Sequence, residues 1–116
     1  MTQQEMLAKL TNISSLNDLQ EYIQRVINAR GFGDETAADA LLMLVEEVGE
    51  LAKAIRKSRG MFVDPDRLEN YGDIEGELAD CFVLLLSIAN AEKINLFDAL
   101  IAKETENCNR HWEKSS

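Results

Sequence analysis

Acidic residues recur at helical spacing in two segments of the sequence. Glu46, Glu47 and Glu50 lie within residues 44–51, and Glu77 and Asp80 come directly before a long apolar run. Residues three or four apart project from the same side of an α-helix, so each segment gathers its carboxylates on one side. Because like charges at this spacing cost a helix roughly a few tenths of a kcal/mol per pair, another interaction must offset the repulsion.

A divalent cation bound between the two segments would offset it. If the two helices pack as antiparallel neighbours, four carboxylates converge in a groove where they are strongly unfavourable without positive charge. Carboxylate oxygens favour Mg²⁺, with Mn²⁺ as a possible substitute, and no CxxC pair indicates zinc. We therefore predict a metal site made of Glu47, Glu50, Glu77 and Asp80. The alternative interpretation is that these are solvated acids beside a core stripe, the commonest position for a helical glutamate.

Hydrogen-bond donors follow one face of the last expected helix. Lys103, Asn107 and Arg110 occupy positions i, i+4 and i+7. Beside a carboxylate–Mg²⁺ cluster they would suit a triphosphate, because arginine makes forked bonds to phosphate and lysine acts as a point charge. The alternative is a solvent-facing pair of cations near a helix C-terminus, where the helix dipole favours them.

Four helices and no strand are expected to position these side chains. Apolar residues at helical spacing predict helices over residues 16–30, 35–58 and 96–113, and a third with a firm part over 74–92 that begins near Pro65 or only after Gly72. Ser14 or Ser15, Asp34 and Asn95 are the expected N-caps. The third helix is apolar nearly all round, which is typical of a central helix or a subunit interface. Short connections favour an all-α, four-helix bundle-like subunit.

Composition limits the class of protein further. We expect one domain over residues 1–116, and a net charge of −9 disfavours binding to bare nucleic acid. Cys81 and Cys108 lack disulfide-framework spacing and are expected to be reduced. The N-terminal residues do not resemble a signal peptide, and no apolar run reaches the length of a membrane span. A soluble, cytoplasmic protein is therefore expected, without a membrane partner.

The two acidic segments together resemble the signature of a known family. Glu46-Glu47-x-x-Glu50, 26 intervening residues and Glu77-x-x-Asp80 are similar to the EExxE…ExxD motif of the MazG-like, all-α nucleoside triphosphate pyrophosphohydrolases. Residues 16–32 resemble the family's first helix, which ends in glycine plus an aromatic residue, and the last helix matches its K…N…R pattern. The resemblance covers residues 16–114, and residues 1–14 are an extension outside it.

The resemblance implies an activity and an assembly. Members cleave nucleoside triphosphates between the α- and β-phosphates, giving a monophosphate and pyrophosphate, and many are thought to clear non-standard or surplus deoxynucleotides. The positions of Glu47, Glu50, Glu77 and Asp80 bind Mg²⁺ in the family. Those of Lys103, Asn107 and Arg110 contact the phosphates or the sugar. Members form dimers, often paired into tetramers, in which neighbouring subunits complete each active site.

The hypothesis is therefore Mg²⁺-dependent hydrolysis of a nucleoside triphosphate by a homo-oligomer, dimer or tetramer. Glu46 or Glu47 is expected to accept the proton of the attacking water. Phe32 is a candidate for stacking on the base, with Ile23 nearby, although a core position at a helix end explains it equally well. Two other classes stay open: a non-catalytic helical regulator that dimerises, and a bundle that binds Mg²⁺–nucleotide without turnover.

Overall fold

The computed structural model describes residues 1–61 and 64–115, with the side chains of 68–70 left aside. These residues contain helices and no strand, which confirms the all-α class. Four long helices and two short ones follow one another along the chain: α1 (Gln3–Ala8), α2 (Leu16–Ala29), α3 (Ala37–Ser58), the 3₁₀ helix η1 (Pro65–Asn70), α4 (Ile74–Ala91) and α5 (Leu96–Cys108).

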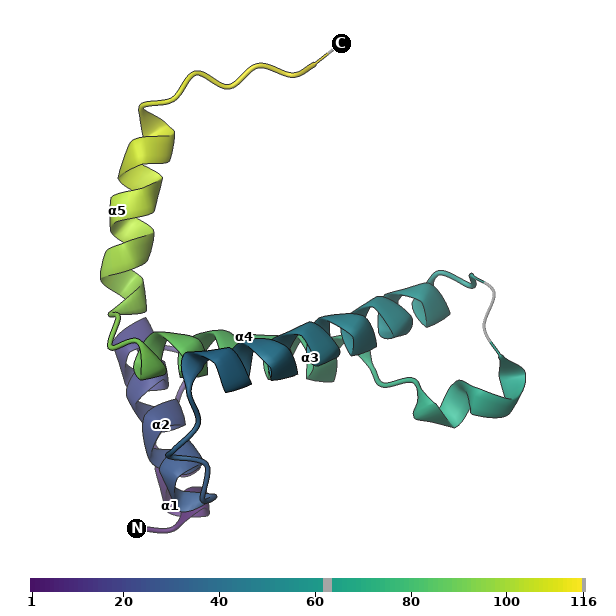
Figure 1. The fold of residues 1–116 in the computed structure, drawn as a ribbon, viewed down its shortest axis with the longest axis horizontal. Helices are drawn as coiled ribbons and strands as arrows, with labels where there is room; N and C mark the ends of the chain where they lie inside the picture. Colours follow the sequence, from purple (N-terminus) through teal and green to yellow (C-terminus); the bar gives the residue numbers. More distant parts are fainter. Residues whose placement is uncertain (62–63, 116) are drawn as a thin grey trace.

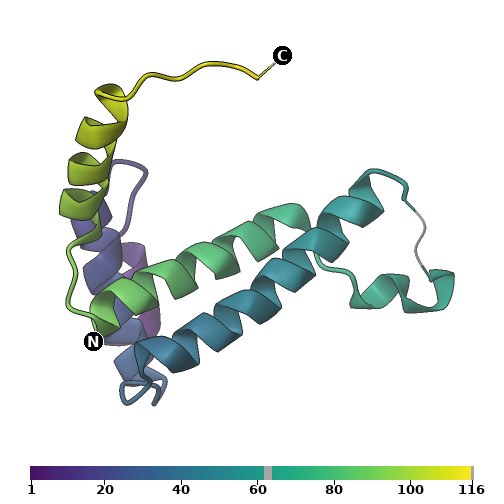
Figure 2. The same cartoon turned by 45° about the horizontal axis from the view of Figure 1, so that its top comes forward.

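The centre of the structure is the antiparallel pair of α3 and α4, which lie side by side along most of their length (Figure 1 and Figure 2). Helix α2 packs against α4 near the end at which α3 begins, and α1 packs against α2. Helix α5 starts beside α2 and then leads away from the α3–α4 pair. Within the described part of the chain, no helix combines the length and the apolar character needed to cross a membrane.

Polar side chains fix where the long helices begin. Ser15 caps α2 and Asn95 caps α5, as expected, and each side-chain oxygen accepts a hydrogen bond from the backbone N–H three residues further on. The predicted cap Asp34 is wrong. Thr36 caps α3 instead, because it forms a reciprocal capping box with Asp39 and the helix therefore begins at Ala37. Hydrogen bonds from the Thr36 backbone and side chain lower the pKa of the Asp39 carboxyl.

Two sets of buried side chains hold the helices together. Ile23 and Val26 of α2 pack with Leu86 of α4 in the main cluster. Ala40 and Ala54 of α3 are also buried, and because they lie 14 residues apart they occupy the same face of the helix. Small side chains on that face let the backbones of α3 and α4 approach closely.

Both ends of the chain differ from expectation. The sequence did not predict α1, a six-residue helix capped by Thr2. Helix α5 ends at Cys108 and not near residue 113, and residues 111–115 are not helical. The Trp112 indole N–H donates to the Asn107 carbonyl oxygen at 2.9 Å, and the Arg110 guanidinium lies 4.4 Å from the centre of the Trp112 ring. The same carbonyl oxygen accepts a hydrogen bond from the Arg110 backbone N–H at 3.2 Å.

Apolar stripes remain exposed on the α3–α4 pair. Leu78, Phe82 and Leu85 have the spacing of core residues, yet each is 41–53% exposed, because Cys81, Leu86 and Ala89 form the buried side of α4. Helix α3 has a similar stripe, and both follow the spacing i, i+4, i+7: Leu41, Val45 and Val48, then Leu78, Phe82 and Leu85. Exposed apolar surface of this extent is typical of an interaction site.

Candidate metal centre

Three carboxylates from α3 and α4 meet at one place. Glu47, Glu77 and Asp80 each offer an oxygen atom, and these three atoms lie within 4.8 Å of one another. Glu47 and Glu77 are half-buried, whereas Asp80 is exposed. Ligand oxygens lie about 2.1 Å from Mg²⁺, so oxygens bound to one ion are about 3–4 Å apart. Small movements of the side chains would bring the three oxygens to that spacing.

The helices determine this convergence. Glu47 lies midway between Ala40 and Ala54, so it is at the centre of the α3 face that packs against α4. Glu77 is in the first turn of α4, whose start is fixed by Asp73, because the Asp73 carboxylate accepts a hydrogen bond from the Gly76 N–H at 2.6 Å. Asp80 follows Glu77 by three residues and shares its side of α4.

The cluster is electrostatically unfavourable without a cation. Burial raises the pKa of the Glu47 carboxyl above its usual value, and a hydrogen bond with Glu77 raises it further. The negative charges of Asp80, Glu77 and Glu50 act in the same direction. Burial, and then the negative charges of Glu47, Glu77 and Asp80, also raise the pKa of the adjacent Cys81 thiol, so this cysteine stays protonated.

Glu77 carries the clearest sign of a missing partner. Its Oε2 atom is buried and has no hydrogen-bond partner among the described residues. A proton on Glu47 can be shared with Glu77, but when both groups are ionised neither supplies a donor. Leaving a buried oxygen unpaired is costly, and buried charges are normally paired or bound to metal. Three oxygen donors of this charge fit Mg²⁺ or Mn²⁺.

Two neighbouring glutamates stand at the edge of this cluster. The Glu50 side chain is 40% exposed, and its Oε1 atom lies 3.5 Å from the Lys53 Nζ atom. It is close enough for its charge to act on Glu47, but it is not among the three groups that converge. Glu46 is exposed on the side of α3 next to Glu47. The structure thus brings together three of the four predicted ligands and leaves Glu50 one helical turn away.

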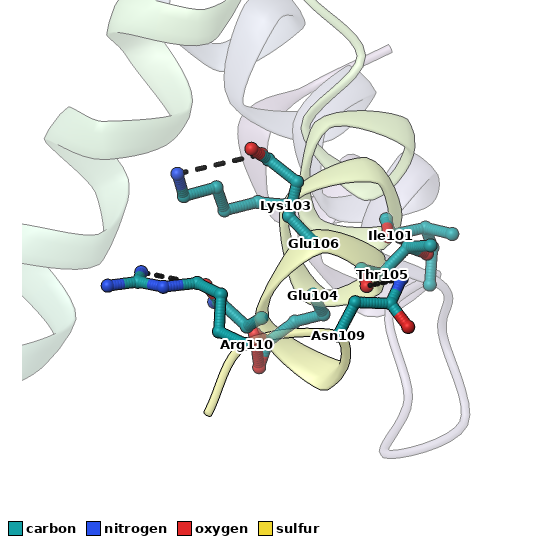
Figure 3. A network of polar contacts seen from close by, with 8 residues as sticks. Ile101, Lys103, Glu104, Thr105, Glu106, Asn109 and Arg110 are labelled. Atoms are coloured by element: carbon teal, nitrogen blue, oxygen red, sulfur yellow. Dashed lines mark hydrogen bonds and ion pairs between the residues drawn. The ribbon is translucent and has the colours of Figure 1, made fainter. Parts of the chain in front are cut away.

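Two of the predicted phosphate-binding residues, Lys103 and Asn107, lie on α5, whereas Arg110 comes just after the end of this helix, and α5 leads away from the cluster. Figure 3 shows Lys103 and Arg110 extending from the same side of this helix. Lys103 Nζ lies 3.6 Å from Glu106, the Asn107 amide donates to Glu104 at 2.6 Å, and Arg110 donates to Asn107 at 3.5 Å. Among the residues that the structure describes, neither cation pairs with the three clustered carboxylates. Helix α5 packs against α2 instead.

Phe32 lines a pocket of about 410 Å³ where α2, α3 and α4 meet. Its ring is half exposed, and Ile23 lines the same pocket, as the sequence suggested. Ser87 and Asn90 of α4 contribute polar side chains to its wall, and sequence reasoning did not single them out. One signal was available, since Ser87 follows Asp80 by seven residues and so lies on the same side of the helix, about 10 Å along its axis.

Comparison with known proteins identifies one matching family. The family model described as the MazG nucleotide pyrophosphohydrolase domain matches residues 35–111, which is more than half of the chain. The chain belongs to the MazG family. No curated protein and no solved structure gives a significant match.

The MazG match covers both acidic segments and the segment that contains Lys103, Asn107 and Arg110. It begins in the connection before α3, so α1 and α2 lie outside it, as do Phe32 and Ile23. The part of the pocket wall that α2 and Phe32 contribute therefore lies outside the matched region.

The raised pKa of Glu47 predicts a pH-dependent stability in this MazG domain. The pKa of the Glu47 carboxyl in the folded chain is above its usual value of 4.5, so the folded state keeps a proton that the unfolded state loses. Without metal, the free energy of unfolding therefore falls as pH rises from about 4.5 through the raised pKa. The variant Glu47→Gln cannot ionise at this position, so its stability should not show this decrease. In EDTA we expect it to be more stable than the parent near pH 7, with the difference shrinking below about pH 4.5, as measured by urea unfolding.

The exposed neighbour Glu46 provides the matched control. Glu46→Gln removes one negative charge from the same helix without touching the three-carboxylate cluster, so its effect on stability should be smaller at neutral pH. An equal stabilisation by Glu47→Gln at acidic and neutral pH would contradict the assignment, because it would show that the gain does not come from ionisation of Glu47.

Proposed function

We propose that this MazG protein hydrolyses nucleoside triphosphates, preferably deoxynucleotides, to a monophosphate and pyrophosphate. The observation that carries the proposal is the three-carboxylate cluster with an unpaired buried oxygen, in a chain whose family is described as nucleotide pyrophosphohydrolases. Glu47, Glu77 and Asp80 would hold Mg²⁺, or Mn²⁺ in its place, and Glu50 would join them by leaving Lys53.

The chain's own residues take distinct parts in this reaction. Bound Mg²⁺ supplies positive charge that neutralises phosphate oxygens and makes a nearby water more acidic. Glu46, exposed and adjacent to the cluster, or Glu47 accepts the proton as water attacks the α-phosphorus. The bond between the α-phosphorus and the bridging oxygen breaks, and pyrophosphate leaves with that oxygen. Lys103 and Arg110 stabilise the leaving group, and Asn107 binds the phosphates or the sugar.

A second copy of the chain would bring these donors to the cluster. Asp80 lies 11 residues before the end of α4, about 16 Å along its axis, and α5 then leads away from the α3–α4 pair (Figure 1). The exposed apolar stripes of α3 and α4 offer a surface for association. We therefore include a homodimer, or a dimer of dimers, in the proposal, with α5 of one subunit placed over the carboxylates of its neighbour.

The pocket beside Phe32 is the proposed site for the base. Its volume of about 410 Å³ falls within the range of small-molecule sites. The pocket lies about 10 Å, or two helical turns, from the cluster along each helix. Ser87 follows Asp80 by seven residues on α4, and Ala40 precedes Glu47 by seven residues on α3. A nucleotide lying along the α3–α4 pair would reach both the carboxylate cluster and the pocket. Phe32 would then stack on the base.

The biological setting is part of the same proposal. Removal of surplus or non-standard deoxynucleotides suits a cytoplasmic protein, and the two free cysteines fit a reducing compartment. The small substrate would be the principal partner, since the net charge of −9 disfavours nucleic acid.

A panel of deoxynucleoside and ribonucleoside triphosphates, incubated with Mg²⁺, Mn²⁺ or EDTA, tests this function. We expect equal amounts of monophosphate and pyrophosphate with either metal, and a rate in EDTA lower by about 100-fold or more. Binding of nucleotide without pyrophosphate release would favour the sensing alternative. Failure to bind either metal or nucleotide would favour the non-catalytic regulator, and release of inorganic phosphate would contradict the position of cleavage.

A further inference from the structure

Gly72 lies directly against one of the clustered carboxylates. It follows η1 and precedes Asp73, the cap of α4. A Cβ atom built on Gly72 would overlap the Glu77 Oε1 atom and lie only 3.2 Å from the Cδ and 3.4 Å from the Cγ of the same side chain. The Glu77 carboxylate therefore occupies the space that any other residue at position 72 would fill.

The backbone does not require glycine at this position. Among the described residues, positive φ angles occur at Gly31, Gly60 and Lys93, but not at Gly72. An L-residue could therefore adopt the same backbone conformation at position 72 without the penalty of the left-handed region. What sets glycine apart here is the missing side chain, and the atoms nearest to the resulting space belong to Glu77.

The position of Glu77 matters to the cluster in two ways. One of its oxygens is within 4.8 Å of the Glu47 and Asp80 oxygens, and its Oε2 atom is buried without a partner among the described residues. A side chain pushed away from Gly72 must rotate about its own bonds, because the backbone of Glu77 is held in the first turn of a capped helix. Such a rotation moves the carboxylate relative to its two neighbours.

We infer that Gly72 is a positioning residue for the metal site: its lack of a side chain lets the connection before α4 pack against Glu77 and orient the carboxylate toward Glu47 and Asp80. The inference rests on the proposed metal-binding function. It assigns a role to a residue outside both acidic motifs. Gly72 itself offers no ligand, so its effect on the metal is exerted entirely through Glu77.

The variant Gly72→Ala tests this role through the affinity of the whole chain for Mn²⁺, without nucleotide. The electron paramagnetic resonance signal of Mn²⁺ left free in solution measures how much metal the protein binds. The added methyl group meets the flexible end of a side chain, so the metal-free variant should fold and melt close to the parent temperature. We expect its dissociation constant for Mn²⁺ to rise about tenfold or more, as when groups that orient metal ligands are removed.

A double-mutant cycle separates this role from a general structural one. In the Glu77→Gln background the ligand is already lost, so Gly72→Ala should have little further effect on Mn²⁺ affinity. An equal loss of affinity in both backgrounds would overturn the inference, and so would an unchanged affinity in the single variant. A Gly72→Ala chain that does not fold would also overturn it, because glycine would then be needed for the fold itself.

The same measurements distinguish failure of the inference from failure of the proposed function. If the parent protein does not bind Mn²⁺, or if Glu77→Gln binds it as tightly as the parent, the proposed metal site is wrong. If the parent binds Mn²⁺ and Glu77→Gln weakens binding while Gly72→Ala does not, the metal site stands and the role of Gly72 is wrong.

Discussion

The variant Glu77→Gln is expected to lower the rate of pyrophosphate release by about 100-fold or more while leaving the chain folded. The substitution keeps the size of the side chain but removes a charged ligand from the cluster. It also relieves the burial of an unpaired carboxylate oxygen, so thermal stability in EDTA should be unchanged or higher. Unlike the parent, the variant should gain little stability from added Mg²⁺.

Glu75→Gln is the matched control for this experiment. Glu75 lies on the same turn of α4 and is exposed, but it is outside the cluster, so its neutralisation should leave both the rate and the Mg²⁺-dependent stabilisation close to those of the parent. Glu50→Gln tests whether Glu50 leaves Lys53 to become a fourth ligand of the bound ion. If it does, the rate of pyrophosphate release by this variant should also fall. An undiminished rate in Glu77→Gln would remove the basis of the metal site.

The long helices could be predicted because local signals determine them. Apolar spacing placed the four main helices, and the short polar side chains Ser15 and Asn95 marked two starts correctly. At α3 the candidates Asp34 and Thr36 compete, and only Thr36 has an acidic partner three residues on that returns the hydrogen bond. Beyond the end of α5, the Trp112 indole N–H donates to the Asn107 carbonyl, a contact that spacing does not reveal.

The metal cluster could be predicted in part. Spacing alone shows that Glu47 shares a side of α3 with Glu50, and that Glu77 shares a side of α4 with Asp80. Which of the α3 glutamates meets α4 depends on the rotation of the helix pair, and here the buried alanines Ala40 and Ala54 place Glu47 at the centre of the contact. Their spacing of seven residues from Glu47 was a signal in the sequence that pointed to it.

Periodicity does not tell which chain covers an apolar or a basic face. Phe82 and Leu85 have the spacing of core residues, but in the single chain they are about half exposed. Lys103 on α5 and Arg110 just after it likewise extend to the same side (Figure 3), yet no described contact brings them to the carboxylates of their own chain. Both discrepancies have one physical explanation if the surface of α3 and α4 is covered by a second copy that also supplies α5.

Restoration of activity by mixing two inactive variants tests that explanation. Glu77→Gln loses a metal ligand, and Arg110→Ala, an exposed change just after α5, should lose the donor for the leaving group. If each site combines carboxylates from one subunit with α5 from the other, a mixed dimer has one site with all its native residues. Co-expression in equal amounts makes about half of the dimers mixed, so about a quarter of the parent activity is expected.

The control is a mixture of Glu77→Gln with Asp80→Asn. Both residues belong to the cluster of a single chain, since α4 supplies them three residues apart, so no mixed dimer of this pair has an intact cluster and no activity should return. If Glu77→Gln with Arg110→Ala also stays inactive, although native mass spectrometry shows mixed dimers, α5 does not act across the interface. Lys103 and Arg110 would then have to reach the substrate from their own subunit, through a movement of α5 toward α4.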